Sequence, residues 1–258
     1  MLVVMTVDFG RTAADYGRHR AGFPDSMFDR FSRYSVGIRG QRVVDVGTGT
    51  GTVARGFALR GCAVIGIDPS EELIGEARRL DAEAGVDVDH RIARAEDTHL
   101  DAGSVDVYAA GQCWHWFDRP GAAAEARRVL RPGGAIVICH FDWLPLAGNM
   151  VDATERLILA HNPSWRAAGG TGMHPPWAAD VSGAGFTAIE TFSYDVDEPY
   201  SHDGWRGRIR ASAGVGATLD ADAVGRFDAE LGVLLAQRFP DEPLQVPHRV
   251  WALVARNP

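Results

Sequence analysis

The chain has 258 residues, of which 46% are hydrophobic and 23% are charged. This balance is typical of a globular protein and excludes a disordered or fibrous one, and we expect one domain over residues 1–258. The net charge of −8 argues against nucleic acid as a partner, because binding phosphates needs clustered Lys and Arg. No stretch is long and apolar enough for a signal peptide or a membrane span, so we expect a cytoplasmic protein, monomeric or homodimeric, that acts on a small molecule.

Short Val- and Ile-rich runs alternate with segments of helical period, which predicts a doubly wound parallel sheet with helices on both faces. The strands are predicted near residues 42–46, 63–67, 86–92, 105–110, 135–140, 187–196 and 246–256. Helices are predicted over 52–60, 71–84, 120–130, 150–161 and 220–239. Residues 144–178 are too long for a simple connection, and we interpret them as a helical cap over the substrate.

The cysteines and acids give no sign of a metal centre. Cys62, Cys113 and Cys139 are odd in number and widely spaced, which fits neither a disulfide framework nor a Cys-x-x-Cys metal site. Asp118 and Asp142 lack a third clustered oxygen ligand. We therefore predict reduced thiols and no metal.

A glycine-rich loop follows the first strand, where residues 43–51 read VVDVGTGTG. The strand ends at Asp45 and opens into three glycines, which let the backbone turn tightly and approach a ligand closely. The helix after the loop should present its N-terminal amides to an anionic group such as a methionine carboxylate. Asp68 ends the next strand, where a carboxylate can accept both hydroxyls of a ribose. Together these features predict a nucleotide site.

The identity of that nucleotide is a separate question. Residues 49–54 read GTGTVA and also satisfy the dinucleotide pattern Gly-x-Gly-x-x-Ala, so an NAD(P)-dependent oxidoreductase is an alternative. Asp45 argues against it, because an acid beside the loop would repel a pyrophosphate but could hold the ammonium of a methionine moiety. A third hypothesis is a protein that binds S-adenosylmethionine without transferring its methyl group.

The loop resembles the first motif of the class I S-adenosylmethionine-dependent methyltransferases, which matches Asp45-x-Gly47-x-Gly49-x-Gly51. The match continues through ARAEDTHLDAGSVDVYAA and EARRVLRPGG, so that it covers roughly residues 41–142. The segments GQCWHWFD and ADYGRHRAGFP look most like the branch that includes trans-aconitate methyltransferase, in which the opening segment folds over the cofactor; here that would be a helical segment over 1–40. The resemblance implies a Rossmann-like sheet in the order 3-2-1-4-5-7-6, with strand 7 antiparallel, and S-adenosyl-L-methionine as methyl donor.

From the motifs and the resemblance we select candidate residues for each role. The cofactor-binding candidates are Tyr16, Arg20, Asp45, Gly47, Thr48, Gly49, Gly51, Asp68, Pro69, Ala95, Glu96, Gly111 and Gln112. The candidates for substrate binding are Trp114, Trp116, Trp143, His161, Trp165 and Arg206.

Methyl transfer from a sulfonium is an in-line displacement, so the protein must mainly hold the acceptor atom behind the methyl carbon. An amine or hydroxyl acceptor also needs a base, whereas a carboxylate does not. His115 is the first candidate for that base and His140 the second. Ordinary packing is the competing interpretation of both histidines and of the tryptophans, and a solvated face is the competing interpretation of Arg206.

Overall fold

The computed structural model describes residues 22–258. Tyr16 and Arg20 lie outside the described residues, as does most of the predicted segment 1–40. The helices and strands follow in the order α2 (Asp25–Arg33), β1 (Arg42–Val46), α3 (Thr52–Leu59), β2 (Ala63–Asp68), α4 (Glu71–Ala84), β3 (Asp89–Ile92), β4 (Val105–Gly111), η2 (Trp114–Trp116), α5 (Arg119–Val129), β5 (Leu130–Trp143), α6 (Met150–His161), α7 (Trp177–Gly183), β6 (Thr187–Tyr200), α8 (His202–Arg210), α9 (Ala221–Arg238) and β7 (Leu244–Arg256).

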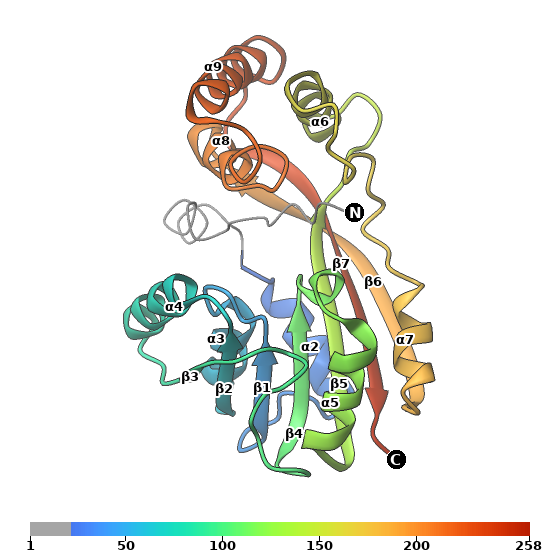
Figure 1. Ribbon diagram of the computed structural model, residues 1–258. Helices are drawn as coiled ribbons and strands as arrows, with labels where there is room; N and C mark the ends of the chain where they lie inside the picture. The colour runs from blue at the N-terminus through green and yellow to red at the C-terminus, as the bar shows by residue number, and fades with distance from the viewer. Residues whose placement is uncertain (1–21) are drawn as a thin grey trace, which may run out of the picture. The chain divides into compact units, whose positions relative to one another are not determined.

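The strands form one seven-stranded sheet in the order β3-β2-β1-β4-β5-β7-β6, which confirms the predicted topology. Strands β1 to β5 pair in parallel, with Val44 opposite Ile65 on one side and Tyr108 on the other. Strand β7 runs opposite to β4, so the sheet is mixed (Figure 1). The carboxyl ends of β1, β2 and β4 therefore meet at one edge of the sheet, where such folds bind ligands.

The described chain divides into two compact units. The sheet unit consists of Gly22–Phe141, Met173–Tyr194 and Val250–Pro258, and the helical unit consists of Asp142–Gly172 and Asp195–Arg249. The unit boundaries fall within β5 and β7 and near the middle of β6, so these three strands are continuous from one unit to the other. The predicted cap over 144–178 thus supplies only part of the helical unit, because α8 and α9 belong to it as well.

The sheet unit is built on strands that are buried on both faces. Val44 and Ile136 pack against Ala122 and Ala126 of α5 in one core, while the intervening residues, such as Val43, are buried as well. Helix α5 lies in front of the sheet in Figure 1, and helix α7 contacts it. Near-continuous apolar strands of this kind are typical of parallel sheets covered on both sides.

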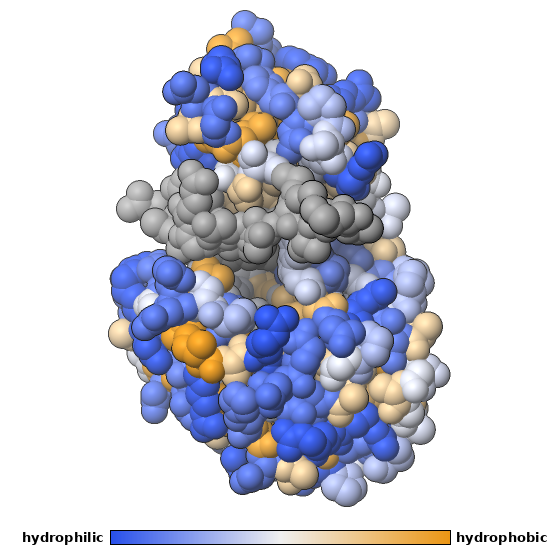
Figure 2. Space-filling model, in the orientation of Figure 1, coloured by the Kyte–Doolittle hydropathy of each residue, from blue (hydrophilic) through white to orange (hydrophobic). Residues whose placement is uncertain are grey.

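The helical unit has a core of its own. Met150 and Ile158 of α6, Trp205 of α8, and Phe227 and Leu231 of α9 pack together there. Both α8 and α9 begin at a side-chain cap, since Ser201 Oγ accepts from the Gly204 amide and an Asp220 oxygen from the Ala223 amide. The visible surface of each unit is mainly hydrophilic, with small separate hydrophobic areas (Figure 2). Within residues 22–258, no helix combines the length and the apolar composition needed to cross a bilayer.

Candidate functional site

The glycine loop adopts the turn that its sequence indicates. Gly47, Gly49 and Gly51 have φ angles of 61°, 55° and 80°, a left-handed conformation that side chains rarely adopt. A Cβ at Gly47 would lie 2.9 Å from the Cβ of Cys113, so this glycine is required by packing. A Cβ at Gly49 would meet no atom of the described residues within 4 Å. Gly49 is therefore the position where a ligand can approach the backbone.

Asp45 stabilises the glycine loop through hydrogen bonds. Its Oδ2 accepts hydrogen bonds from the Thr48 hydroxyl at 2.7 Å and from the Ala54 amide of α3 at 3.0 Å. Burial raises the pKa of this carboxyl to about 7, although these two hydrogen bonds oppose the rise. Oδ1 is buried and has no hydrogen-bond partner among residues 22–258. One oxygen of the Asp45 carboxyl thus holds the loop, and the other can still accept a hydrogen bond.

Asp68 links the ends of β1 and β2. Its Oδ2 accepts from the Gly49 amide and its Oδ1 accepts from the Ser70 amide, each at 2.9 Å. Burial raises the pKa of Asp68, and the two amides lower it in part. Each carboxylate oxygen can accept more than one hydrogen bond, so both remain able to take a ribose hydroxyl. Pro69, another candidate, is exposed beside it.

A buried ionic network behind the loop was not predicted. Asp81 of α4 lies 2.9 Å from Arg55 Nε and 2.6 Å from His90 Nε2, and Arg55 also donates to the Thr50 carbonyl. The network therefore joins the loop to α3, α4 and β3. A signal for it exists in the sequence, because Asp81 continues the buried stripe of Ile74 and Ala77.

The remaining cofactor candidates differ in the contacts that they make within the chain. The Ala95 carbonyl accepts from the Tyr108 hydroxyl at 2.9 Å, and Glu96 Oε1 accepts from the Asp118 amide at 2.9 Å. A Cβ at Gly111 would lie 2.4 Å from a methyl carbon of Val53, so Gly111 serves the packing of β4 on α3. Gln112 has a φ of 56°, an uncommon conformation that clusters at functional sites.

The helix α3 begins at Gly51 without a side-chain cap. Of its first amides, that of Ala54 is taken by Asp45. The amides before it point out of the helix start, which is the arrangement that favours an anionic ligand group. The predicted role of this helix in holding a carboxylate is thus compatible with its geometry.

The two candidate bases lie together in the sheet unit with a third histidine. The ring centroids of His115 and His140 are 5.6 Å apart, and those of His140 and His174 are 4.2 Å apart. Trp177 stacks on His174 at 4.1 Å with an interplanar angle of 5°. His115 is exposed and His140 is buried. His174, in the loop before α7, thus joins the candidate bases.

The tryptophan candidates do not share one environment. Trp114 is fully buried in the sheet-unit core and its indole N–H donates to Asp180, which gives it a packing role and leaves its predicted contact with a substrate unsupported. Trp116, beside His115, is 51% exposed. Trp143 and Trp165 belong to the helical unit, where both pack against its core.

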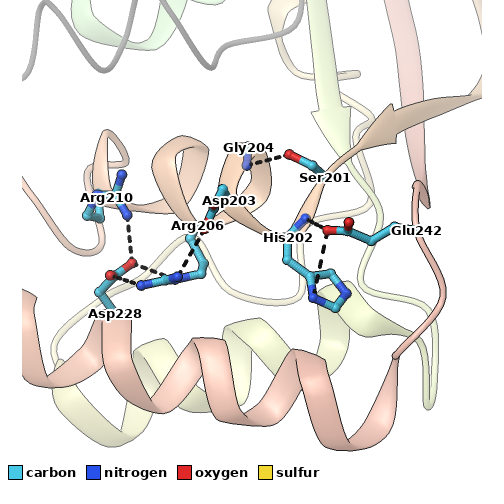
Figure 3. A network of polar contacts seen from close by, with 8 residues as sticks. All are labelled: Ser201, His202, Asp203, Gly204, Arg206, Arg210, Asp228 and Glu242. Atoms are coloured by element: carbon cyan, nitrogen blue, oxygen red, sulfur yellow. Dashed lines mark hydrogen bonds and ion pairs between the residues drawn. The ribbon is translucent and has the colours of Figure 1, made fainter.

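Arg206 and His161 are engaged within the helical unit. The Arg206 guanidinium pairs with Asp228 of α9 and lies 3.1 Å from Asp203, and Arg210 reaches the same Asp228 carboxylate at 2.7 Å (Figure 3). His161 Nε2 lies 3.2 Å from Glu230 of α9. Arg206 lies within α8, which follows β6, and ties that helix to α9. Its role in binding substrate stays a prediction.

Comparison with known proteins points to one class of enzyme. Residues 44–138 match a family model described as a methyltransferase domain. An uncharacterized methyltransferase of Mycobacterium tuberculosis is 33% identical over 132 residues, which are 51% of each chain. A ubiquinone biosynthesis O-methyltransferase of an Azoarcus species is 36% identical over 39% of this chain and 44% of its own length. The chain thus spans about half the length of the curated relatives it matches.

Solved structures extend the likeness to the whole fold. A protein of Anaeromyxobacter dehalogenans assigned as a type II methyltransferase superposes with a TM-score of 0.63 at 26% identity, over 92% of this chain and 96% of the other. Phosphoethanolamine N-methyltransferase 2 of Haemonchus contortus, solved with S-adenosyl-L-methionine, superposes with a TM-score of 0.56 at 18% identity, over 97% of this chain and 56% of the other. The chain has the Rossmann-like fold of class I methyltransferases.

Proposed function

We propose that the protein transfers a methyl group from S-adenosyl-L-methionine to a small-molecule acceptor, at oxygen, nitrogen or carboxylate. The observation that carries the proposal is the pairing of the open Gly49 backbone with the Asp68 carboxylate, whose Oδ2 accepts from the Gly49 amide. The matched methyltransferase domain covers both residues. A place in the trans-aconitate methyltransferase branch, a cytoplasmic location and a monomer or homodimer stay predictions from the sequence.

The residues of the loop fit this cofactor. Asp68 would accept the ribose hydroxyls, the start of α3 would hold the methionine carboxylate, and the buried Oδ1 of Asp45 would accept from the methionine ammonium. When bound, S-adenosyl-L-methionine supplies a methyl group on a sulfonium, a leaving group that departs as a neutral thioether. The protein then needs to orient the acceptor and to keep water away from it.

The histidines supply the proton chemistry that the acceptor requires. For a hydroxyl or amine, His115 or His140 takes the proton from the acceptor atom as the new bond to carbon forms. His115 is the first choice, because it is exposed whereas His140 is buried. A carboxylate acceptor needs no base and only correct placement.

Calorimetry with S-adenosylhomocysteine tests the proposal. We expect saturable binding to the wild-type protein, a loss of about tenfold or more in Asp68→Ala, and no change in Asp87→Ala, an exposed acid just after α4. NADH and NADPH should give no heat. Binding of either dinucleotide with none of S-adenosylhomocysteine would favour the oxidoreductase. Binding of S-adenosylhomocysteine without turnover of a broad acceptor panel would favour a protein that does not transfer the methyl group.

A further inference from the structure

Arg55 is a cation close to the start of a helix, where a positive charge is normally unfavourable. It belongs to the first turns of α3, which begins at Thr52, and the dipole of a helix is positive at that end. The Arg55 side chain is only 17% exposed, so water stabilises its charge only in part. This placement needs a compensating role, which the contacts of the guanidinium identify.

The Arg55 guanidinium contacts the second half of the glycine loop. Its Nη2 donates to the Thr50 carbonyl at 2.8 Å, and a Cβ at Gly51 would lie 3.2 Å from the same nitrogen. Thr50 and Gly51 are both buried, and they connect Gly49 to the first residue of α3. Arg55 therefore contacts the backbone that leads from the open glycine into the start of the helix.

Two further buried side chains fix the position of the guanidinium. Asp81 Oδ1 lies 2.9 Å from Arg55 Nε, and Asp81 Oδ2 lies 2.6 Å from His90 Nε2. His90 packs closely on the backbone of β2, because a Cβ at Gly66 would lie 2.6 Å from its Nδ1. Contacts from β3 and α4 thus hold Arg55 in the orientation that reaches the loop.

We propose that Arg55 is a positioning residue, which holds the backbone of Thr50 and Gly51 so that the start of α3 is aligned with the amino-acid half of the cofactor. The inference rests on the proposed function, in which the start of α3 holds the methionine carboxylate and Asp68 holds the ribose. Asp68 ends β2 and is oriented by hydrogen bonds from backbone amides. Loss of Arg55 should therefore affect the two halves of the cofactor unequally.

The competing role of Arg55 is a general link between two helices. Arg55 and Asp81 join α3 to α4, and these helices contact each other beside β2 (Figure 1). A link of this kind stabilises the fold as a whole, so its loss would affect every part of the cofactor site alike. The two roles differ in which half of the cofactor loses affinity.

The test compares S-adenosylhomocysteine with methylthioadenosine, which has the adenosyl thioether but lacks the amino-acid half. Both ligands are titrated by calorimetry into the full chain. Arg55→Gln should weaken binding of S-adenosylhomocysteine by about tenfold or more and that of methylthioadenosine by less than about twofold, because only the former contacts the start of α3. Arg55→Lys should weaken S-adenosylhomocysteine binding less than Arg55→Gln, since Lys keeps the charge but not the planar fork.

Two variants serve as controls. Arg60→Gln replaces the arginine at the other end of α3, which donates to the Gly56 carbonyl and pairs with Asp25. It should leave both affinities unchanged. Asp68→Ala should weaken the binding of both ligands, because each carries the ribose hydroxyls.

Hydrogen–deuterium exchange without ligand gives a second measurement of the same alignment. The amides of residues 49–54 should exchange faster in Arg55→Gln than in the wild type, whereas those of β2 should exchange at the same rate. Equal rates at 49–54 in the two proteins would overturn the proposal. This measurement decides the question if methylthioadenosine binds too weakly to be titrated.

Two titration results would also overturn the proposal: equal fold losses for the two ligands in Arg55→Gln, or wild-type affinity for S-adenosylhomocysteine in that variant. Circular dichroism checks that each variant folds, and Arg55→Lys carries the comparison if Arg55→Gln does not. Absence of S-adenosylhomocysteine binding from the wild type would refute the proposed function. Binding by the wild type with equal losses in the variant would refute only the role of Arg55.

Discussion

Replacing Asp45 by Asn should make the protein more stable and less able to bind its cofactor. The Asn side-chain oxygen can still accept from the Thr48 hydroxyl and the Ala54 amide, while its NH₂ takes the place of the unpartnered Oδ1. Asn also removes a carboxyl whose pKa is raised by burial from 3.8 to about 7. The variant therefore keeps the hydrogen bonds to Thr48 and Ala54 and loses the buried charge.

The magnitude follows from linkage between protonation and folding. Because the pKa of Asp45 is higher in the folded state, this group stabilises the fold most below pH 3.8, and stability is lost as the pH rises toward 7. A difference of about three pKa units corresponds to about 4 kcal/mol at pH 8.5, of which less than half is already lost at pH 5. The free energy of unfolding of Asp45→Asn should thus exceed that of the wild type by a margin that grows by about 3 kcal/mol between pH 5 and pH 8.5.

Urea unfolding of both proteins at pH 5, 7 and 8.5, without ligand, measures this margin. Calorimetry with S-adenosylhomocysteine on the same preparations should show weaker binding by Asp45→Asn, since the variant offers a donor where the ammonium needs an acceptor. A margin that stays constant with pH would refute the assigned burial of the charge. Unchanged affinity would refute the contact between Asp45 and the ammonium.

Four further substitutions separate structural from functional roles. Gly47→Ala should cost about 2 kcal/mol or more of unfolding free energy, since its Cβ would crowd Cys113. Gly49→Ala has a similar φ angle but open space, so it should cost about 1 kcal/mol and mainly weaken binding of S-adenosylhomocysteine. Equal losses of stability in thermal or urea unfolding would contradict this difference between the two glycines. Asp81→Asn should lose about 3 kcal/mol in urea unfolding because Arg55 loses its buried counter-ion and His90 loses its carboxylate partner. A loss below about 1 kcal/mol would show that the network is dispensable. His115→Ala should lower turnover about a hundredfold while affinity for S-adenosylhomocysteine stays the same, and full turnover at saturating acceptor would remove His115 from catalysis.

The elements that sequence predicts well carry their own end signals. The helix predicted over 71–84 has these bounds in the structure because Ser70 accepts from the Leu73 amide and Gly85 ends it in a left-handed conformation. The helix predicted over 150–161 agrees as well, with Asn149 as its cap. Helix α8 was not predicted, since it contains Gly204 and Gly207 and buries only a short apolar stripe. Propensity alone therefore does not reveal α8.

The sequence does not show which distant helices pack against one another. Periodicity showed that residues 150–161 and 220–239 are amphipathic, but it does not show which surface each helix covers. In the structure α6, α8 and α9 share one core, to which Tyr200 of β6 and Val246 of β7 also contribute.

The candidate site shows the same limit: sequence spacing predicts which residues lie close together, but not where their hydrogen-bonding groups point. The spacing of Asp45, Gly47 and Asp68 correctly predicted that the carboxylates lie beside the loop. It did not show that Asp45 bonds Thr48 and Ala54, because that depends on where backbone amides point after folding. Asp45 would repel a pyrophosphate less than a fully charged carboxylate would, since the raised pKa of Asp45 leaves this group partly neutral near pH 7.

The three thiols give the molecule a property useful for experiments. Cys62, Cys113 and Cys139 form no disulfide and are buried. Burial raises the pKa of Cys62 to about 11 and that of Cys139 well above its usual value. Thiolate is the form that attacks maleimides, so the native cysteines should label slowly. One new cysteine on each unit, at exposed positions such as Leu59 and Val233, would accept a fluorophore pair. Energy transfer between the two fluorophores would then report the distance between the units without first removing any native cysteine.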